Sequence, residues 1–433
     1  MTFKLDRRTR RDEDRREDVQ PHAFFAHELP DRLAQNGALA AAAAAHFRTR
    51  PLTIEACGET WSLVPSGQTI AVVAGAAEEA LVVSLSARQF SDWVQNQLTF
   101  NGMMVARDLA YRGGSLRDIS TWDSLWIAIL EGWPVVDPAL TFRDAAGEPL
   151  AIGRTFGPSD APEDIAHFLR EAGFVHLRGW IAPDLVAAIS REMDAARDGY
   201  VEGDGKSWWA EVADGSRLCV RLQEFVERSP TTKALLKSES WERLTRILEG
   251  NDELARKPVE GRIIEALFKP VGVVSGPSDL PFHRDCHLGR HSYACARMTI
   301  GIAITPSNAQ NGQLRVIAGS HRLAMPVEVA KTEPYLPLVA LSTEPGDVTV
   351  HLSCTLHEAT APISCERRVM YTEIPLAGHL IEHVGGRVAR ARERPDPRIP
   401  TVTTRRQAMV LPLPSGAQRL AAITRLANQE RQG

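Results

Sequence analysis

The stretch that decides the fold is His283-Arg284-Asp285, which is followed much later by His357 and Arg368. Residues i and i+2 of a β-strand point to the same face, so His283 and Asp285 can reach one ion together while Arg284 points away. A third ligand must then come from another strand, and His357 lies in a segment rich in strand-like runs. Two imidazoles and one carboxylate are the ligands of a mononuclear non-haem iron(II) site, which leaves positions open for a chelating co-substrate and for O2. The pattern therefore predicts such a centre.

The residues around this triplet follow the order expected of a β-rich domain. The strand-like and turn-like pieces are the buried-strand pattern Met298 to Ile304, the turn Asn311-Gly312-Gln313-Leu314, Gly319-Ser320-His321, Gly346-Asp347 and the strand Val348 to Leu352. His351, on that last strand, competes with His357 for the third-ligand position. His357 is favoured because its spacing to a following arginine is better.

With these pieces in this order, the chain resembles the phytanoyl-CoA dioxygenase family of iron(II)/2-oxoglutarate oxygenases over roughly residues 160 to 376. The resemblance implies an α+β protein whose catalytic domain is a double-stranded β-helix, of the jelly-roll or cupin-like kind. It also implies that iron(II) is held by His283, Asp285 and His357, and that 2-oxoglutarate and O2 are the co-substrates.

The resemblance further implies that Arg368 binds the distal carboxylate of 2-oxoglutarate. A guanidinium fork matches a carboxylate bidentately and stays charged at any working pH. Arg367 is the rival, because successive strand residues face opposite ways and only one of the two can point into the barrel. The spacing from His357 favours Arg368.

Several other residues are expected to line the pockets. Thr360 stands beside Ala359, a position where family members often carry a hydroxyl, and Thr299 shares a strand face with Arg297. We expect Thr299 and Thr360 to line the 2-oxoglutarate pocket and Arg297 to line the substrate pocket. For Thr299 and Arg297, which share a strand face, a plain role in the barrel wall is the alternative.

Aromatic and histidine residues provide further candidates for the substrate side. Trp208 and Trp209 are expected to form a lid or an aromatic wall, with core packing as the alternative. His287 is expected at the mouth of the site. The cluster Cys286, His287, His291 and Cys295 also has the residue types of a zinc site, but it directly follows the iron-binding triplet.

The expected activity is oxidation of an unactivated C–H bond, by hydroxylation, in a small apolar or secondary-metabolite substrate, with release of succinate and CO2. Asp285 disfavours halogenation, because related halogenases carry a small residue in place of the carboxylate. Desaturation, cyclisation and epimerisation remain open as outcomes. The alternative class is a non-catalytic protein that binds a lipid or another small molecule on the same barrel.

Composition limits the remaining possibilities. The chain has 433 residues, 44% of them hydrophobic, and a formal net charge of -4, which predicts several soluble domains and no nucleic-acid partner. Six scattered cysteines predict a reducing, cytoplasmic location. The sequence shows no signal peptide and no apolar run of about 18 residues, so no membrane span is expected.

We expect four segments. Residues 1–21 form a charged flexible arm, 22–148 a small α+β domain, 158–380 the oxygenase domain, and 381–433 an extension with a terminal helix. The order of strands and helices in 22–148 weakly resembles a sterol-carrier-type domain. Such a domain could hold an apolar substrate or serve as a scaffold for a homodimer, although its tryptophans are also typical of an ordinary core.

Overall fold

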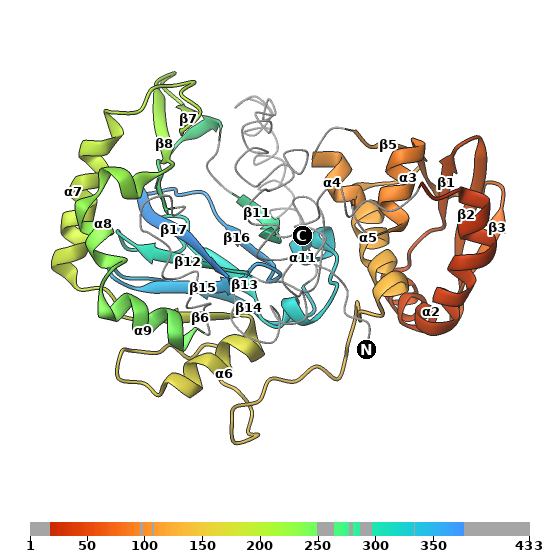
Figure 1. Cartoon of the computed structure of the whole chain (residues 1–433), viewed down its shortest axis with the longest axis horizontal. Helices are drawn as coiled ribbons and strands as arrows, with labels where there is room; N and C mark the ends of the chain where they lie inside the picture. Colours follow the sequence, from red (N-terminus) through yellow and green to blue (C-terminus); the bar gives the residue numbers. More distant parts are fainter. Residues whose placement is uncertain are drawn as a thin grey trace, which may run out of the picture.

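The computed structural model describes residues 18–95, 98–105, 108–248, 264–276, 280–285, 297–332 and 334–375. These residues make a smaller N-terminal α+β part and a larger part built on two further sheets (Figure 1). Most of the expected charged arm and the whole of the expected extension at 381–433 lie outside the described residues.

The N-terminal part combines one mixed sheet with several helices. Its elements are α1 (Pro21–Ala23), the π-helix η3 (Phe24–Glu28), α2 (Leu29–Phe47), β1 (Leu52–Ala56), β2 (Glu59–Ser66), β3 (Thr69–Ala74), β4 (Leu81–Leu85), α3 (Ala87–Val94), α4 (Phe100–Val105), β5 (Ala110–Arg112) and α5 (Leu116–Glu131). The strand order is β3-β2-β1-β4-β5, with β1 antiparallel to β2 and parallel to β4. Ser86 and Ser115 form capping boxes that start α3 and α5.

Tryptophans occupy the centre of this part. Trp93 stacks on Trp126 with ring centroids 3.9 Å apart and on Phe100 at 5.2 Å, and all three side chains are buried. The indole N–H of Trp122 donates to the carbonyl oxygen of Arg50. These contacts agree with the core interpretation of the tryptophans. The likeness to a sterol carrier stays an expectation.

The larger part places twelve strands in two sheets. Its strands are β6 (Phe174–Leu177), β7 (Ser207–Val212), β8 (Arg217–Leu222), β9 (Ile264–Lys269), β10 (Val273–Ser275), β11 (Leu280–His283), β12 (Arg297–Ala303), β13 (Leu314–Ile317), β14 (Leu338–Leu341), β15 (Val348–Leu352), β16 (His357–Ala359) and β17 (Arg367–Pro375). The large sheet has the order β10-β7-β8-β9-β17-β12-β15-β6, and the small sheet has the order β11-β16-β13-β14. From β9 onward the chain passes repeatedly between the two sheets, as a double-stranded β-helix requires.

Helices cover the outer face of the large sheet (Figure 1). They are α6 (Pro162–Ala172), α7 (Pro183–Arg197), η4 (Phe225–Arg228), α8 (Pro230–Leu235) and α9 (Glu239–Ile247). Apolar residues of alternate strand positions, such as Met298 and Ile300, join these helices in one buried core. Because side chains alternate along a strand, the intervening positions, such as Thr299, face inward toward the small sheet.

The two parts contact each other through α5 and the segment around α11 (Val327–Thr332). The backbone N–H of Ala324 donates to the Pro134 carbonyl at 2.8 Å, and the Tyr335 hydroxyl donates to the Val135 carbonyl at 2.5 Å. Among the described helices, none has the length and apolar character needed to cross a membrane.

Asp123 provides a pH-dependent test of the N-terminal core. Its carboxylate accepts the backbone N–H groups of Phe100 and Asn101, both at 2.8 Å. Burial raises the pKa of Asp123 to about 7, against the opposing effect of these hydrogen bonds. In the unfolded chain the pKa is about 4. Between these values the folded protein holds a proton that the unfolded chain has lost, so stability falls as pH rises.

Asp123→Asn removes this proton linkage. We expect the Tm of the wild type, relative to the variant, to fall between about pH 4 and 7 and to stay level above pH 7. Thermal unfolding followed by tryptophan fluorescence measures both proteins at each pH, and other titrating groups cancel in the difference. A difference that is constant across this range would contradict the prediction.

Candidate metal centre

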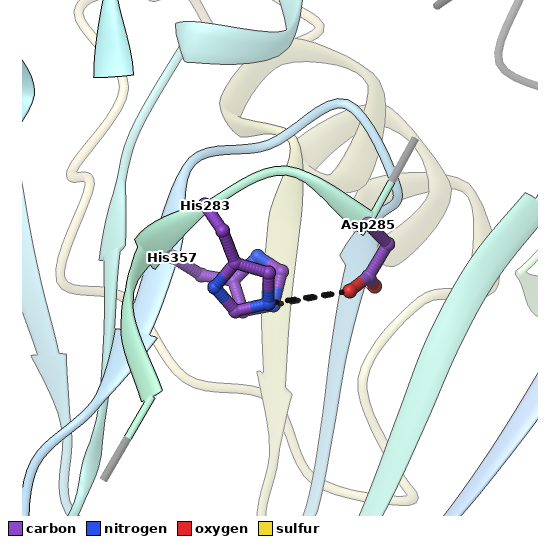
Figure 2. A group of neighbouring side chains, drawn as sticks. All are labelled: His283, Asp285 and His357. Carbon is purple, nitrogen blue, oxygen red and sulfur yellow. Dashed lines mark ion pairs between the residues drawn. The ribbon is translucent and has the colours of Figure 1, made fainter. Parts of the chain in front are cut away.

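The structure brings His283, Asp285 and His357 together (Figure 2). His283 is the last residue of β11 and pairs in register with His357, the first residue of β16. The Asp285 Oδ1 atom lies 3.4 Å from His283 Nε2 and 3.7 Å from His357 Nε2. One expectation needs correction: β11 ends at His283, so Asp285 reaches the site from just beyond the strand.

Backbone carbonyls fix the tautomers of both histidines. His283 Nδ1 lies 2.9 Å from the Pro281 carbonyl, and His357 Nδ1 lies 2.9 Å from the Thr355 carbonyl. A carbonyl oxygen only accepts, so each Nδ1 carries the proton and each Nε2 presents a lone pair. Two lone pairs and a carboxylate oxygen thus face one another, and a cation between them would relieve the repulsion.

The protonation states also suit a metal ion. Burial alone would raise the pKa of Asp285, but the surrounding imidazoles of His357, His283 and His351 bring it well below its usual value. Burial lowers the pKa of His357 well below its usual value, and His351 and His283 lower it further. At neutral pH the site therefore combines an ionised carboxylate with a neutral imidazole, which are the forms that bind metals.

The second oxygen of Asp285 has its own neighbours on the large sheet. Thr299 Oγ1 donates to Asp285 Oδ2 at 2.9 Å, and His351 Nε2 lies 3.5 Å from the same atom. Thr299 and His351 are register partners on β12 and β15. The sequence predicts His351 only as a rival ligand, and Thr299 as a co-substrate contact or a plain part of the barrel wall. Only the pairing of β12 with β15 brings the two side chains to a shared neighbour.

Arg284, between two of the three residues, is fully buried. Its guanidinium donates to four backbone carbonyls, those of Cys354 at 2.9 Å, Met325 at 2.7 Å, Leu323 at 3.0 Å and Ser320 at 3.2 Å. The side chain does point away from the site, as expected. It ties the end of β11 to the loop that leads into His357.

The expected orientation of Arg368 is wrong. Thr299 faces the inner side, and β17 is aligned so that Glu373, Tyr371, Val369 and Arg367 share this side. Arg368 faces the helices instead, where its guanidinium pairs with Asp194 of α7 at 2.8 Å and with Glu366. Strand alternation, which the spacing argument did not determine, decides the inward residue.

The inward arginine, Arg367, is buried and has neutral partners. Its guanidinium donates to the Gly312 carbonyl at 2.6 Å and to the Tyr371 hydroxyl at 3.2 Å. Lys269, its register partner on β9, donates to the carbonyls of Ala359 and Thr360. The sequence gives no sign of Lys269 at the site, because only the pairing of β9 with β17 brings it to this face.

The other residues that the sequence places at the site lie in different parts of the structure or outside the described residues. Trp208 is buried with the Arg221 guanidinium over its ring, whereas Trp209 packs against the main core. Thr360 has a buried hydroxyl that makes no hydrogen bond with any described residue. His287 and the other members of the expected zinc cluster lie outside the described residues, as does the side chain of Arg297.

Residues 169–370 match the sequence profile of the family described as phytanoyl-CoA dioxygenase (PhyH). These residues form a PhyH domain. The match confirms the resemblance seen in the sequence, and with it the cofactors that the family uses, iron(II), 2-oxoglutarate and O2. The PhyH domain contains all three residues of the candidate metal centre and both arginines.

Solved structures similar to the chain include enzymes of this cofactor class. SnoN, described as a non-haem alpha-ketoglutarate-dependent epimerase from nogalamycin biosynthesis, is 21% identical over 50% of this chain and 80% of its own, with a TM-score of 0.39. AviO1 from Streptomyces viridochromogenes Tue57 is 22% identical over 48% and 91%, with a TM-score of 0.38. EctD from S. alaskensis is 17% identical over 56% and 86%, with a TM-score of 0.39. No curated protein matched the chain.

Arg284→Met tests how strongly the buried guanidinium stabilises the segments that carry the candidate metal centre. Removing it leaves four buried carbonyls without their donor, so we expect a loss of roughly 3–5 kcal/mol in the free energy of unfolding. Calorimetric unfolding measures the loss. Arg178→Met, at an exposed position, is the matched control and should change the Tm little. Equal effects of the two substitutions would contradict a special role for Arg284.

Proposed function

We propose that this protein is an iron(II)- and 2-oxoglutarate-dependent dioxygenase that hydroxylates an unactivated C–H bond of a small molecule. The observation that carries the proposal is the pair of Nε2 lone pairs directed at Asp285 Oδ1. That donor set, two imidazole nitrogens and one ionised carboxylate, fits iron(II) and leaves positions open for further ligands. A purely structural role gives no reason for three unprotonated donor atoms to face one another in a buried place.

His283, Asp285 and His357 would hold the metal, and each is kept in place by a separate contact. The carbonyls of Pro281 and Thr355 orient the two imidazoles, and Thr299 orients the carboxylate. When bound, iron(II) with 2-oxoglutarate and O2 supplies the oxidation, in which 2-oxoglutarate is converted to succinate and CO2. The protein's own contribution is orientation and exclusion of water.

Arg367, rather than Arg368, is the residue that we assign to the distal carboxylate of 2-oxoglutarate. Its guanidinium is buried on the inner face and hydrogen-bonded only to neutral groups within the described chain, so it retains its charge for a ligand. Lys269 adds a second cation beside it. Arg368 is already neutralised by Asp194 and Glu366 on the outer face.

The inner face also supports a polar substrate over a lipid-like one. Beside Tyr371, the face continues through Glu265 to Arg221, two buried residues that form an ion pair, and on to Trp208. Buried charges of this kind are costly next to a hydrocarbon chain but can hydrogen-bond a polar ligand. We propose a small substrate with polar groups that contact this wall.

We further propose that residues 22–148 fold as their own unit. Their core draws almost entirely on residues before position 137, and Ala324 is the single member contributed by the PhyH domain. Packed aromatic rings at its centre support a scaffold role over that of a lipid carrier.

Loss of a ligand should abolish metal binding. For His283→Ala and Asp285→Ala we expect the affinity for Fe(II) to fall by more than about 100-fold, beyond the 10–100-fold typical of residues that only support a ligand. Anaerobic titration with Fe(II) and 2-oxoglutarate should give a visible charge-transfer band in the wild type and in His167→Ala, and none in the ligand variants. A normal band in Asp285→Ala would contradict the metal assignment.

Replacing each of the two neighbouring arginines in turn tests which of them binds 2-oxoglutarate. Arg367→Ala should weaken 2-oxoglutarate binding by about 2–4 kcal/mol, or roughly 30- to 1,000-fold, because it removes a charge-assisted pair from a buried place. Arg368→Ala removes only a partly exposed ion pair and should leave binding within a few-fold of the wild type. Titration of the anaerobic Fe(II) protein with 2-oxoglutarate measures both, and the reverse order would contradict the assignment.

A further inference from the structure

The two oxygens of Asp285 have different surroundings. Oδ1 faces His283 Nε2 and His357 Nε2, both on the small sheet. Oδ2 accepts the hydroxyl of Thr299 at 2.9 Å and lies 3.5 Å from His351 Nε2, both on the large sheet. The carboxylate is therefore held between the sheets, with one oxygen turned to each.

In His351, unlike in the two candidate histidine ligands, no backbone carbonyl determines which ring nitrogen carries the proton. No carbonyl or other described group accepts from His351 Nδ1, and Nε2 lies 3.5 Å from Asp285 Oδ2, longer than an ordinary hydrogen bond, although the side chain is only 2% exposed. The other two histidines have a carbonyl at Nδ1, which forces the lone pair onto Nε2. With no such constraint, His351 Nε2 can carry the proton and donate a hydrogen bond to an oxygen. An N–H that points at an oxygen cannot bind a metal at the same time.

We propose that His351 is a positioning residue which, together with Thr299, holds Asp285 Oδ2 so that only Oδ1 is presented to the metal. This inference rests on the proposed metal site. A carboxylate whose two oxygens are both free can bind a metal through both of them. Two donors on Oδ2 favour binding through one oxygen, which keeps a coordination position open for the co-substrate.

The arrangement of the strands makes this pair of donors rigid. Thr299 and His351 lie directly opposite each other on β12 and β15, two strands of the large sheet that are each hydrogen-bonded on both sides. The ring of His351 lies 4.0 Å from that of His357, which limits its rotation. The donors to Oδ2 are thus fixed by one sheet and the two imidazole ligands by the other.

Binding of Co(II), a spectroscopic substitute for iron(II), tests the proposal without turnover. For His351→Phe and for Thr299→Val, we expect the dissociation constant for Co(II) to rise by about 10- to 100-fold. We also expect a weaker visible ligand-field absorption, because a carboxylate that binds through both oxygens raises the coordination number. His351→Gln retains an N–H donor and should recover much of the wild-type affinity and spectrum.

The matched control is His167→Phe, the same substitution at a histidine of α6 whose ring contacts the Arg143 carbonyl. Its Co(II) affinity and spectrum should match the wild type. Thermal unfolding of each metal-free protein shows whether the variants fold. If His351→Phe does not fold, then Thr299→Val and His351→Gln decide the matter by the same two readouts.

Each outcome separates this proposal from the proposed function. Wild-type affinity and spectrum in both His351→Phe and Thr299→Val would overturn the positioning role while leaving the metal site intact. Complete loss of Co(II) binding in His351→Phe, equal to that in His357→Ala, would make His351 a ligand and would also overturn the proposal. Failure of the wild-type protein to bind Co(II) would instead remove the metal site itself.

Discussion

The carboxylate of Asp285, whose side chain is only 16% exposed, is the group on which the rest of the site depends. A negative charge away from water is costly unless charges or hydrogen bonds compensate it. Here the compensation comes from two sheets at once, with His283 and His357 on one side and Thr299 and His351 on the other. The two sheets must therefore keep a fixed separation, which makes the packing of the barrel a condition for the chemistry.

Arg284 fixes the segments that carry the two imidazoles. It lies between His283 and Asp285 in sequence, yet its guanidinium points away and binds the carbonyls of Ser320, Leu323, Met325 and Cys354. Those carbonyls belong to the turn after β13 and to the loop before β16, so one side chain links the two segments that carry the imidazoles. A charged group buried among carbonyl dipoles has little freedom to adopt another arrangement.

The inner face of the large sheet also carries the charged residues that would contact the co-substrate and the substrate. Arg367 and Lys269 place positive charge at one end of this face. The Arg221–Glu265 ion pair follows on the same face, next to Trp208. The outer face of the same strands is mostly apolar and packs on α6 to α9, with Arg368 pairing with Asp194 of α7. Because side chains alternate along each strand, one face of the sheet packs on the helices and stabilises the fold, while the other face is left to contact ligands.

Much of the site could be predicted from the sequence because it depends on local chemistry. The triplet at 283–285, the distal His357 and the family resemblance each follow from residue types and their order, and ligand chemistry admits few such combinations. The core role of the tryptophans near α5 follows from hydrophobic spacing in the same way.

What only the tertiary structure decided is which side chains share a face and a neighbour. Whether Arg367 or Arg368 points inward depends on where β17 begins and how it pairs with β12, and a shift of one residue reverses the answer. Lys269 reaches Arg367, and His351 reaches Asp285, only through pairings between strands distant in sequence. Spacing along a chain fixes alternation within one strand, but register between strands is set by packing of the whole barrel, and sequence order alone does not contain it.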